Sequence, residues 1–364
     1  MSRIKVRPKL LLRAVNNTLR VYAASVILGF LLLVIIPSWI RWLWFFVVGV
    51  LFLVSILATF AEDWVPKSRV PINSKAVVIS GCDSGFGHKL AQRLDDLGLH
   101  VFAGCLFPEG DGAKSLKKAA SSKLQVIPMD VTSDESIDKA LKCVSQKIKD
   151  NKLWAVICNA GINDGGELFW TNTDIIQRVI DINTFGVVRL TKAFLPLLCK
   201  SKGRVVTVCS AASLYTYPGM VPYCMSKQAT KSFCDGLRLE MYQFGVKVVT
   251  VEPFMYKTAI TNLEQTKRYV TKTWEQAPAE VKEFYAEDYI QRFHKAVAHL
   301  LTFTISDKPQ QVVDILEEAV MALHPKYSYT PGTFYSRLSM WLVKRLPKQI
   351  ADFFIADEFA CKID

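Results

Sequence analysis

A tyrosine and a lysine four residues apart are the side chains of this sequence best suited to proton transfer. Tyr223 and Lys227 belong to the segment Tyr-Cys-Met-Ser-Lys, and a spacing of four places both on one face of a helix. The unperturbed pKa of a phenol is about 10, and a neighbouring ammonium lowers it toward neutrality by stabilising the phenolate. Ser210 precedes the pair at the end of an apolar run, where its hydroxyl could bind the same substrate oxygen. The pair could therefore act as acid or base on a hydroxyl or carbonyl group, although the spacing alone is also common on helix surfaces.

A glycine-rich turn is the second feature with chemical meaning. The residues Gly81-Cys82-Asp83-Ser84-Gly85-Phe86-Gly87 follow a short apolar run and begin a segment with helical periodicity. Glycines in such a turn let the backbone approach a pyrophosphate, and the amides at the start of the helix point toward its charge. In this strand, turn and helix context the sequence predicts a dinucleotide-phosphate site.

The elements that must position these residues alternate between strand and helix from Lys75 onward. The predicted strands are Ala76–Ser80, His100–Cys105, Leu124–Met129, Trp154–Cys158, Gly203–Val208 and Lys247–Glu252. The predicted helices are Phe86–Leu97, Asp134–Lys149, Asp174–Leu198 and Pro222–Tyr242. This alternation predicts an α/β fold with a doubly wound, Rossmann-type parallel sheet, whose ligands bind at the carboxyl ends of the strands.

The amino-terminal segment is typical of a membrane anchor. Two apolar runs, Val21–Ile36 and Trp42–Phe60, flank a short polar stretch, and a spanning helix needs about 20 apolar residues. The second run is long enough and the first is marginal, so either both span as a hairpin or only one spans. A cleaved signal peptide is disfavoured because the apolar stretch is too long.

Charge and cysteine content exclude other classes. The chain has 364 residues and a formal net charge of +12. Half of that excess lies in the first 20 residues, as Arg3, Lys5, Arg7, Lys9, Arg13 and Arg20. A basic tail of this kind favours a cytoplasmic amino terminus over nucleic-acid binding. The nine cysteines lack the spacing of a metal site, so we expect no metal and reduced thiols facing the cytosol.

Taken together, these motifs resemble the short-chain dehydrogenase/reductase family over about residues 75–323. The glycine turn, Asn159-Ala160-Gly161, Asn183, Ser210 and the Tyr223–Lys227 pair carry the resemblance. Gly81–Gly87, Gly203-Arg204-Val205-Val206 and Thr261-Asn262-Leu263-Glu264 are similar to the branch that contains retinol dehydrogenases, membrane-bound 17β-hydroxysteroid dehydrogenases and D-3-hydroxybutyrate dehydrogenase.

The resemblance implies a role for each matching residue. Tyr223 would be the general acid or base, Lys227 would lower its pKa and bind the nicotinamide ribose, and Ser210 would orient the substrate oxygen. Asn183 would hold a water that relays protons through Lys227. The cofactor-binding residues would be Gly81, Asp83, Ser84, Gly85, Phe86, Gly87, Asp130, Val131, Asn159, Ala160, Gly161 and Thr258, together with Tyr223 and Lys227; Ser210 and Phe254 would contact substrate.

Two positions depart from the family pattern. Cys158 stands where the family usually has asparagine, and Phe254 follows Pro253 where the family usually has glycine. A phenylalanine there must shift the loop or narrow the pocket. The chain is therefore predicted to be either a dehydrogenase with altered substrate choice or a catalytically weak, dinucleotide-binding scaffold or regulatory protein of the same fold, and the intact Ser210, Tyr223, Lys227 and Asn183 favour the enzyme.

Charge around the expected cofactor site favours NAD, with NADP as the alternative. The second strand ends in Gly104-Cys105-Leu106, without the acidic residue that often binds the ribose of NAD. No basic residue lies within Cys82–Ser84 to bind a 2′-phosphate, and Asp83 would repel one.

The last 120 residues bear on the substrate class and on contact with a membrane. Residues 258–304 are rich in aromatics and are interpreted as a substrate lid, or as a helical subdomain with its own small core. Residues 334–354 interleave apolar and basic side chains, which fits a helix on a membrane surface or a packed final helix.

The predicted organisation is a cytoplasmic tail (1–20), transmembrane segments (21–61), a Rossmann domain (75–325) and a carboxyl-terminal amphipathic extension (326–364). An anchored enzyme with an apolar lid predicts a lipophilic alcohol or ketone, such as a steroid (ecdysteroid precursors included) or a retinoid. A small hydroxy acid fits less well. We expect attachment to the endoplasmic reticulum bilayer with the catalytic domain facing the cytosol, and a homodimer is an open alternative to a monomer.

Overall fold

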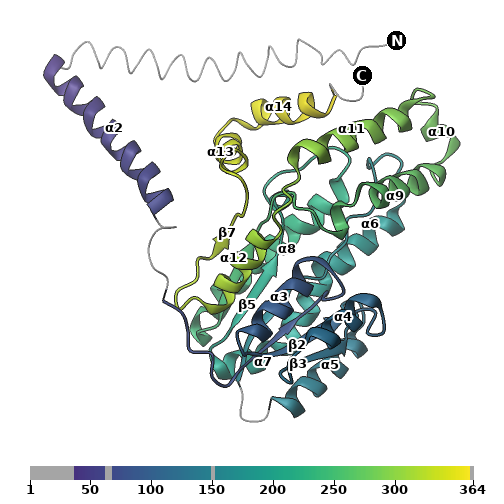
Figure 1. Cartoon of the computed structure of the whole chain (residues 1–364). Helices are drawn as coiled ribbons and strands as arrows, with labels where there is room; N and C mark the ends of the chain where they lie inside the picture. Colours follow the sequence, from purple (N-terminus) through teal and green to yellow (C-terminus); the bar gives the residue numbers. More distant parts are fainter. Residues whose placement is uncertain (1–36, 62–67, 149–151, 361–364) are drawn as a thin grey trace. The chain divides into compact units, whose positions relative to one another are not determined.

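The computed structural model describes residues 37–61, 68–148 and 152–360 (Figure 1). The tail 1–20 and the first apolar run, Val21–Ile36, lie outside the described residues. The chain divides into two compact units, residues 1–67 and 68–364.

The described part of the first unit is one apolar helix, α2 (Ser38–Ala61), which contains the second predicted run. The large apolar side chains described between Trp39 and Val54 are exposed, for example Trp42 at 76% and Phe46 at 69%. At 1.5 Å per residue, its 24 residues extend about 36 Å, which exceeds the roughly 30 Å of a bilayer's hydrocarbon core.

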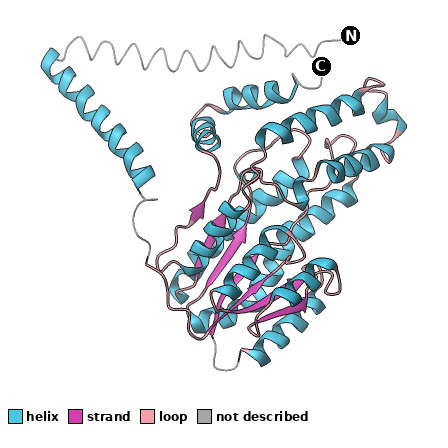
Figure 2. Ribbon diagram, in the orientation of Figure 1, coloured by secondary structure: helices cyan, strands magenta, loops and turns pink. Residues whose placement is uncertain are grey.

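The second unit is built on a seven-stranded parallel sheet in the order β3-β2-β1-β4-β5-β6-β7 (Figure 2). The strands are β1 (Lys75–Ile79), β2 (His100–Cys105), β3 (Leu124–Pro128), β4 (Lys152–Cys158), β5 (Arg204–Val208), β6 (Lys247–Val251) and β7 (Ser328–Tyr329). The six predicted strands and their parallel arrangement are confirmed. The seventh strand was not predicted.

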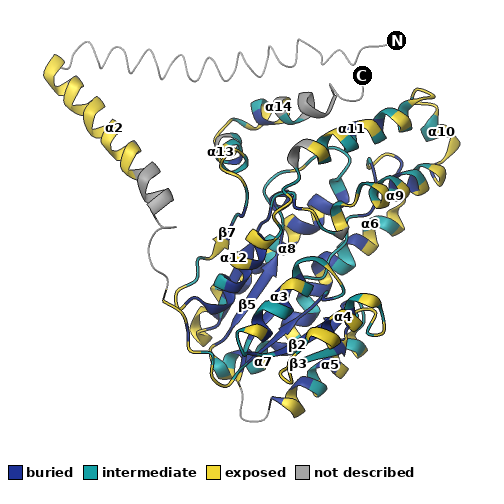
Figure 3. Ribbon diagram, in the orientation of Figure 1, coloured by how far each residue is buried: buried dark blue, intermediate teal, exposed yellow. Residues whose placement is uncertain are grey.

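Helices cover both faces of this sheet. They are α3 (Gly85–Asp96), α4 (Asp111–Ala119), α5 (Asp134–Lys147), α6 (Thr173–Ile180), α7 (Gly186–Ser201), α8 (Val221–Met241) and α12 (Gln310–Met321). Successive residues of a strand face opposite layers: Val77 and Ile79 pack toward α3, α4 and α12, whereas Ala76 and Val78 pack toward α5, α7 and α8. Burial on both faces explains why the strands are continuous apolar runs (Figure 3).

The predicted helix Asp174–Leu198 is interrupted. A π-helical segment, η1 (Asp181–Phe185), separates α6 from α7. The composite helix Thr173–Ser201 is long and apolar enough to cross a membrane by composition, but Leu190, Phe194 and Leu198 of α7 lie in the core beside the sheet. Its apolar character therefore reflects burial within the domain.

The segment predicted as a lid forms three helices, α9 (Leu263–Glu275), α10 (Ala279–Lys282) and α11 (Tyr289–Thr304). They share an aromatic core around the buried Trp170. The ring centroids of Trp274, Tyr285, Phe293 and Tyr289 lie 5.1, 5.3, 5.4 and 5.7 Å from that of Trp170. These helices are therefore held together by edge-on aromatic contacts of their own.

The chain enters the second unit through an antiparallel clasp. Val70 N–H donates to Met321 O at 2.8 Å, and Leu323 N–H donates to Ser68 O at 2.7 Å. The buried Glu317 carboxylate pairs with Arg69 at 2.7 Å and with Arg93 at 2.8 Å. Residues 68–70 are thus fixed to the end of α12 before β1 begins.

Two helices end the described chain, α13 (Phe334–Val343) and α14 (Lys348–Ala360), with Pro347 between them. α13 is attached to the loop after β5 because Tyr215 OH donates to Met340 O at 2.5 Å. Phe334 and Tyr335 on its first turn are 63% and 79% exposed.

Candidate active site

A cleft of about 940 Å³ lies at the carboxyl ends of the central strands. The strand order reverses between β1 and β4, and this is the point at which doubly wound sheets bind ligands. The cleft is lined by the predicted site residues Gly81, Asp83, Ser84, Gly85, Phe86, Asp130, Val131, Asn159, Ala160, Gly161, Ser210, Tyr223, Lys227, Phe254 and Thr258. Gly87 and Asn183 are buried and are not among the residues that line it.

The glycine turn connects β1 to α3 and requires its glycines. Gly81 and Gly85 have φ values of +69° and +65°, a region that disfavours other residues. A Cβ on Gly87 would lie 2.4 Å from Asn159 Nδ2 and 2.5 Å from Gly81 O. The glycines therefore let the turn pack closely against the end of β4, and the turn borders the cleft at the start of α3, where the first amides of a helix fit the phosphates of a dinucleotide.

Asn159, at the end of β4, fixes the shape of that turn. Its Nδ2 donates to Ser80 O at 3.0 Å and to Gly81 O at 2.9 Å. Its backbone N–H donates to Ser80 Oγ at 3.0 Å. Asn159 thus joins the two strands that flank the cleft, besides lining it.

Asp83 places a negative charge at the end of β2. Its carboxylate accepts hydrogen bonds from the backbone N–H of Leu106 at 3.0 Å and of Phe107 at 2.8 Å. β2 itself ends without an acidic residue, so Asp83, from the turn after β1, is the acidic side chain at this position. The sequence placed Asp83 in the turn but gave no signal that its carboxylate reaches β2.

The remaining cofactor-side residues are held by short local contacts. Asp130 Oδ1 accepts from Thr132 N–H at 2.9 Å and from Thr132 Oγ1 at 2.7 Å. Val131 is buried. Thr258 N–H donates to Thr261 Oγ1 at 2.9 Å on the opposite wall.

Ser210 and Tyr223 meet at the floor of the cleft. Ser210 lies beyond the end of β5, and its Oγ accepts from Ala212 N–H at 3.1 Å. Tyr223, on the first turn of α8, is hydrogen-bonded to Ser210. Burial raises the pKa of Tyr223 to about 12, and the Ser210 bond acts in the opposite direction. The phenol is therefore protonated at neutral pH.

Lys227 lies one turn after Tyr223 and is also buried. Its Nζ donates to Val208 O at 3.0 Å and lies 5.7 Å from the centroid of the Tyr223 ring. Burial lowers the pKa of Lys227. In the protein alone burial therefore disfavours the charged form of both groups, and the lowering of the phenol pKa by the ammonium stays a prediction.

Asn183 is fully buried in the π-helical segment η1. Its Oδ1 accepts from Ile162 N–H and its Nδ2 donates to Ile162 O, each at 2.8 Å. Nδ2 also donates to Ser226 Oγ at 2.9 Å. The side chain therefore joins the loop after β4 to α8, and its role in holding a water stays a prediction.

A second cavity of about 150 Å³ adjoins Ser210 and Tyr223. Phe254 lies in the wall of both cavities. Among the described residues that line the second cavity, none carries a charged side chain. Its outer wall includes Phe293, Val297, Leu300 and Leu301 of α11. Sequence reasoning missed Leu300 and Leu301, although their helical spacing with Phe293 and Val297 was a usable signal.

Comparison with known sequences identifies related proteins. Residues 75–268 match the family described as short chain dehydrogenase. Retinol dehydrogenase 7 of Mus musculus is 36% identical over 301 residues, which cover 82% of this chain and 93% of that protein. The mitochondrial D-beta-hydroxybutyrate dehydrogenase of Bos taurus is 36% identical, with 78% of this chain and 84% of that protein covered. The 17-beta-hydroxysteroid dehydrogenase type 6 of Bos taurus is 34% identical, with 86% and 96% covered.

A solved structure shares the fold. The crystal structure of a short-chain dehydrogenase from Streptomyces avermitilis superposes with a TM-score of 0.61 and 21% sequence identity. The alignment covers 80% of this chain and all of that one. At this identity the likeness supports the Rossmann-type architecture.

Proposed function

Because this chain belongs to the short-chain dehydrogenase family and is an NAD(P)-dependent oxidoreductase acting on CH–OH groups, we propose that its substrate is a lipophilic alcohol or ketone of the steroid or retinoid class. The uncharged second cavity beside Ser210 and Tyr223 carries this proposal. A carboxylate inside it would lose its hydration without gaining a counter-charge. A hydroxy acid, the substrate class named for one relative, therefore fits this cavity less well.

We propose a separate role for each group of residues in the cleft. Ser210 and Tyr223 both line the cleft and the second cavity, where their hydroxyls would hold the substrate oxygen. Tyr223 would give a proton to that oxygen during ketone reduction and remove it during alcohol oxidation. Lys227 would hold the nicotinamide ribose, and the turn Gly81–Gly87 would hold the phosphates. The bound dinucleotide would supply or accept the hydride.

We propose NAD as the cofactor, and the position of Asp83 supports this choice. Its carboxylate is fixed at the end of β2, where a 2′-phosphate of NADP would meet a like charge. Arg178 and Lys227 are the basic residues among the described lining of the cleft. Both lie away from β2, so neither offsets this repulsion.

A substrate panel tests the proposal directly. Full-length protein purified in detergent should reduce NAD with retinol or a hydroxysteroid, with kcat/KM about tenfold or more above that for 3-hydroxybutyrate. NAD should be preferred to NADP by about tenfold, as one close like-charge contact predicts. Reduced-cofactor fluorescence measures both. Binding of NAD without turnover of any alcohol would contradict the proposal and favour the catalytically weak scaffold.

We also propose that the chain is anchored in the endoplasmic reticulum membrane with its catalytic unit in the cytosol. The length and exposed apolar surface of α2 support one span. The basic residues before it favour a cytoplasmic amino terminus, which a hairpin of both apolar runs would satisfy. The exposed aromatic side chains of α13 would add a weaker surface contact.

Deleting residues 1–67 should release the enzyme from the membrane without loss of cofactor binding. The clasp at residues 68–70 and the whole core of the second unit remain in the truncated chain. We expect carbonate extraction to leave the full-length protein in the pellet and the truncated protein in the supernatant, with NADH affinity changed by less than about twofold. Full-length protein in the carbonate supernatant would show that the anchor assignment is wrong.

A further inference from the structure

The start of the carboxyl-terminal extension runs beside β6, the strand that leads into the Pro253-Phe254 turn. Thr250 N–H donates to Tyr327 O at 2.9 Å, Glu252 N–H to Tyr329 O at 2.7 Å, and Phe254 N–H to Pro331 O at 3.1 Å. This ladder continues past the end of β7. It sets residues 331–332 against the Pro253-Phe254 turn that departs from the family pattern.

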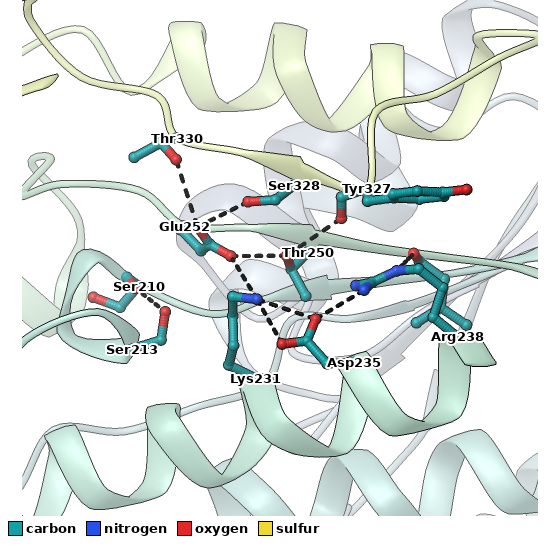
Figure 4. A network of polar contacts seen from close by, with 11 residues as sticks. Ser210, Ser213, Lys231, Asp235, Arg238, Thr250, Glu252, Tyr327, Ser328 and Thr330 are labelled. Atoms are coloured by element: carbon teal, nitrogen blue, oxygen red, sulfur yellow. Dashed lines mark hydrogen bonds and ion pairs between the residues drawn. The ribbon is translucent and has the colours of Figure 1, made fainter. Parts of the chain in front are cut away.

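A buried carboxylate holds the ladder in register (Figure 4). Glu252 accepts hydrogen bonds from Thr250 Oγ1 at 2.8 Å and from Ser328 Oγ at 2.9 Å. Lys231 Nζ lies 3.9 Å from the same carboxylate and 2.8 Å from that of Asp235. Lys231 and Asp235 belong to α8, the helix that carries Tyr223 and Lys227. The extension is therefore fixed relative to the catalytic helix.

Gly332, the next residue of this segment, lies against the ring of Phe254. A Cβ at Gly332 would lie 2.4 Å from Cδ2 and 3.0 Å from Cε2 of Phe254. Gly332 does not have a left-handed φ, so its backbone would accept alanine without strain. Phe254 also lines both cavities, so their open space is available to the ring if a side chain at Gly332 displaces it.

We propose that Gly332 is a specificity-determining residue, because it leaves the space that the Phe254 ring occupies and so sets how far the ring projects into the substrate cavity. A glycine at position 254, as is usual in the family, would need no space for a ring. In this chain position 254 carries the ring, and the glycine that leaves space for it is residue 332 of the neighbouring segment. The substrate class in this inference rests on the proposed function, whereas the pairing of Gly332 with Phe254 rests on geometry alone.

A double-mutant cycle tests the pairing through substrate choice. In full-length protein in detergent, Gly332→Ala should lower kcat/KM for a hydroxysteroid by about tenfold or more relative to a short secondary alcohol, since the ring narrows the cavity. In a Phe254→Ala background the same substitution should change that ratio by less than about twofold. Gly236→Ala is the matched control, because a Cβ there meets no atom within 4 Å. An equal effect of Gly332→Ala in both backgrounds would overturn the inference.

Crystallography of Gly332→Ala decides the same question without any enzymatic assay. The Phe254 ring should be displaced toward the cavity, and a ring that keeps its parent position would overturn the inference. If Gly332→Ala fails to fold, adding Phe254→Ala should restore folding, and failure to restore it would also overturn the inference. A panel without turnover would contradict the proposed function alone, because the ring position is read independently.

Discussion

Replacing Tyr223 with phenylalanine should reduce turnover by about a thousandfold or more, which is within the range for loss of a positioned acid or base. The hydroxyl of Tyr223 is hydrogen-bonded to Ser210 in the cleft, and we expect its buried phenol to supply the exchangeable proton. The ring would keep its place in the small cluster with Ala212 and Cys224. Cofactor affinity should therefore change by less than about twofold.

Two measurements separate these effects. Steady-state cofactor reduction reports turnover, and titration of the protein with NADH reports affinity. Tyr242→Phe is the matched control, because Tyr242 follows the same helix and is 83% exposed. Parent-like turnover in Tyr223→Phe would remove Tyr223 from the reaction.

The second large effect is expected at the cofactor turn. Gly87→Ala would place a methyl group 2.4 Å from Asn159 Nδ2 and 2.5 Å from Gly81 O. The Asn159 amide would have to leave the turn and lose its bonds to Ser80 O and Gly81 O. A displaced turn would lose a hydrogen bond to a charged phosphate, worth about 1.5–3 kcal/mol, so NADH affinity should fall by about 10- to 100-fold.

Fluorescence titration of NADH against parent, Gly87→Ala and Gly236→Ala checks this prediction. Gly236→Ala is the same chemical change at a site with no atom within 4 Å of the new methyl group, so it should bind NADH as the parent does. An affinity in Gly87→Ala within threefold of the parent would show that the turn does not set cofactor binding.

The sequence predicted strongly where its signal was local. Five of the six longer strands, all but the edge strand β3, are mainly apolar runs buried along most of their length, and the glycine turn lies directly between strand and helix, so pattern and context agreed. β7 was missed because its two residues are held in the sheet by partners distant in sequence, including Thr250 and Glu252. α4 was missed because only Ala113 and Leu116 of its nine residues are buried, which leaves little periodicity.

In the candidate site, too, local features could be predicted and contacts between distant segments could not. The types and spacing of Ser210, Tyr223 and Lys227 predicted that they share a site, and all three line one cleft in the structure. The rise in the pKa of Tyr223 could not be predicted, because it comes from burial by segments distant in the sequence. The contact of Gly332 with Phe254 joins residues far apart in the chain, and neither residue carries a local signal of the other.

The antiparallel clasp between residues 68–70 and the end of α12 has a mechanical consequence. Force transmitted along the chain from the amino-terminal segment meets the bonds of Val70 to Met321 and of Ser68 to Leu323 before it reaches β1. The Arg69–Glu317–Arg93 ion pairs add charge-assisted bonds at the same place. The load therefore passes into α12 and α3, at the end of the sheet opposite the glycine turn. A pull on the amino-terminal segment would thus be borne at the carboxyl-terminal ends of α12 and α3, whereas the glycine turn lies at the opposite end of α3.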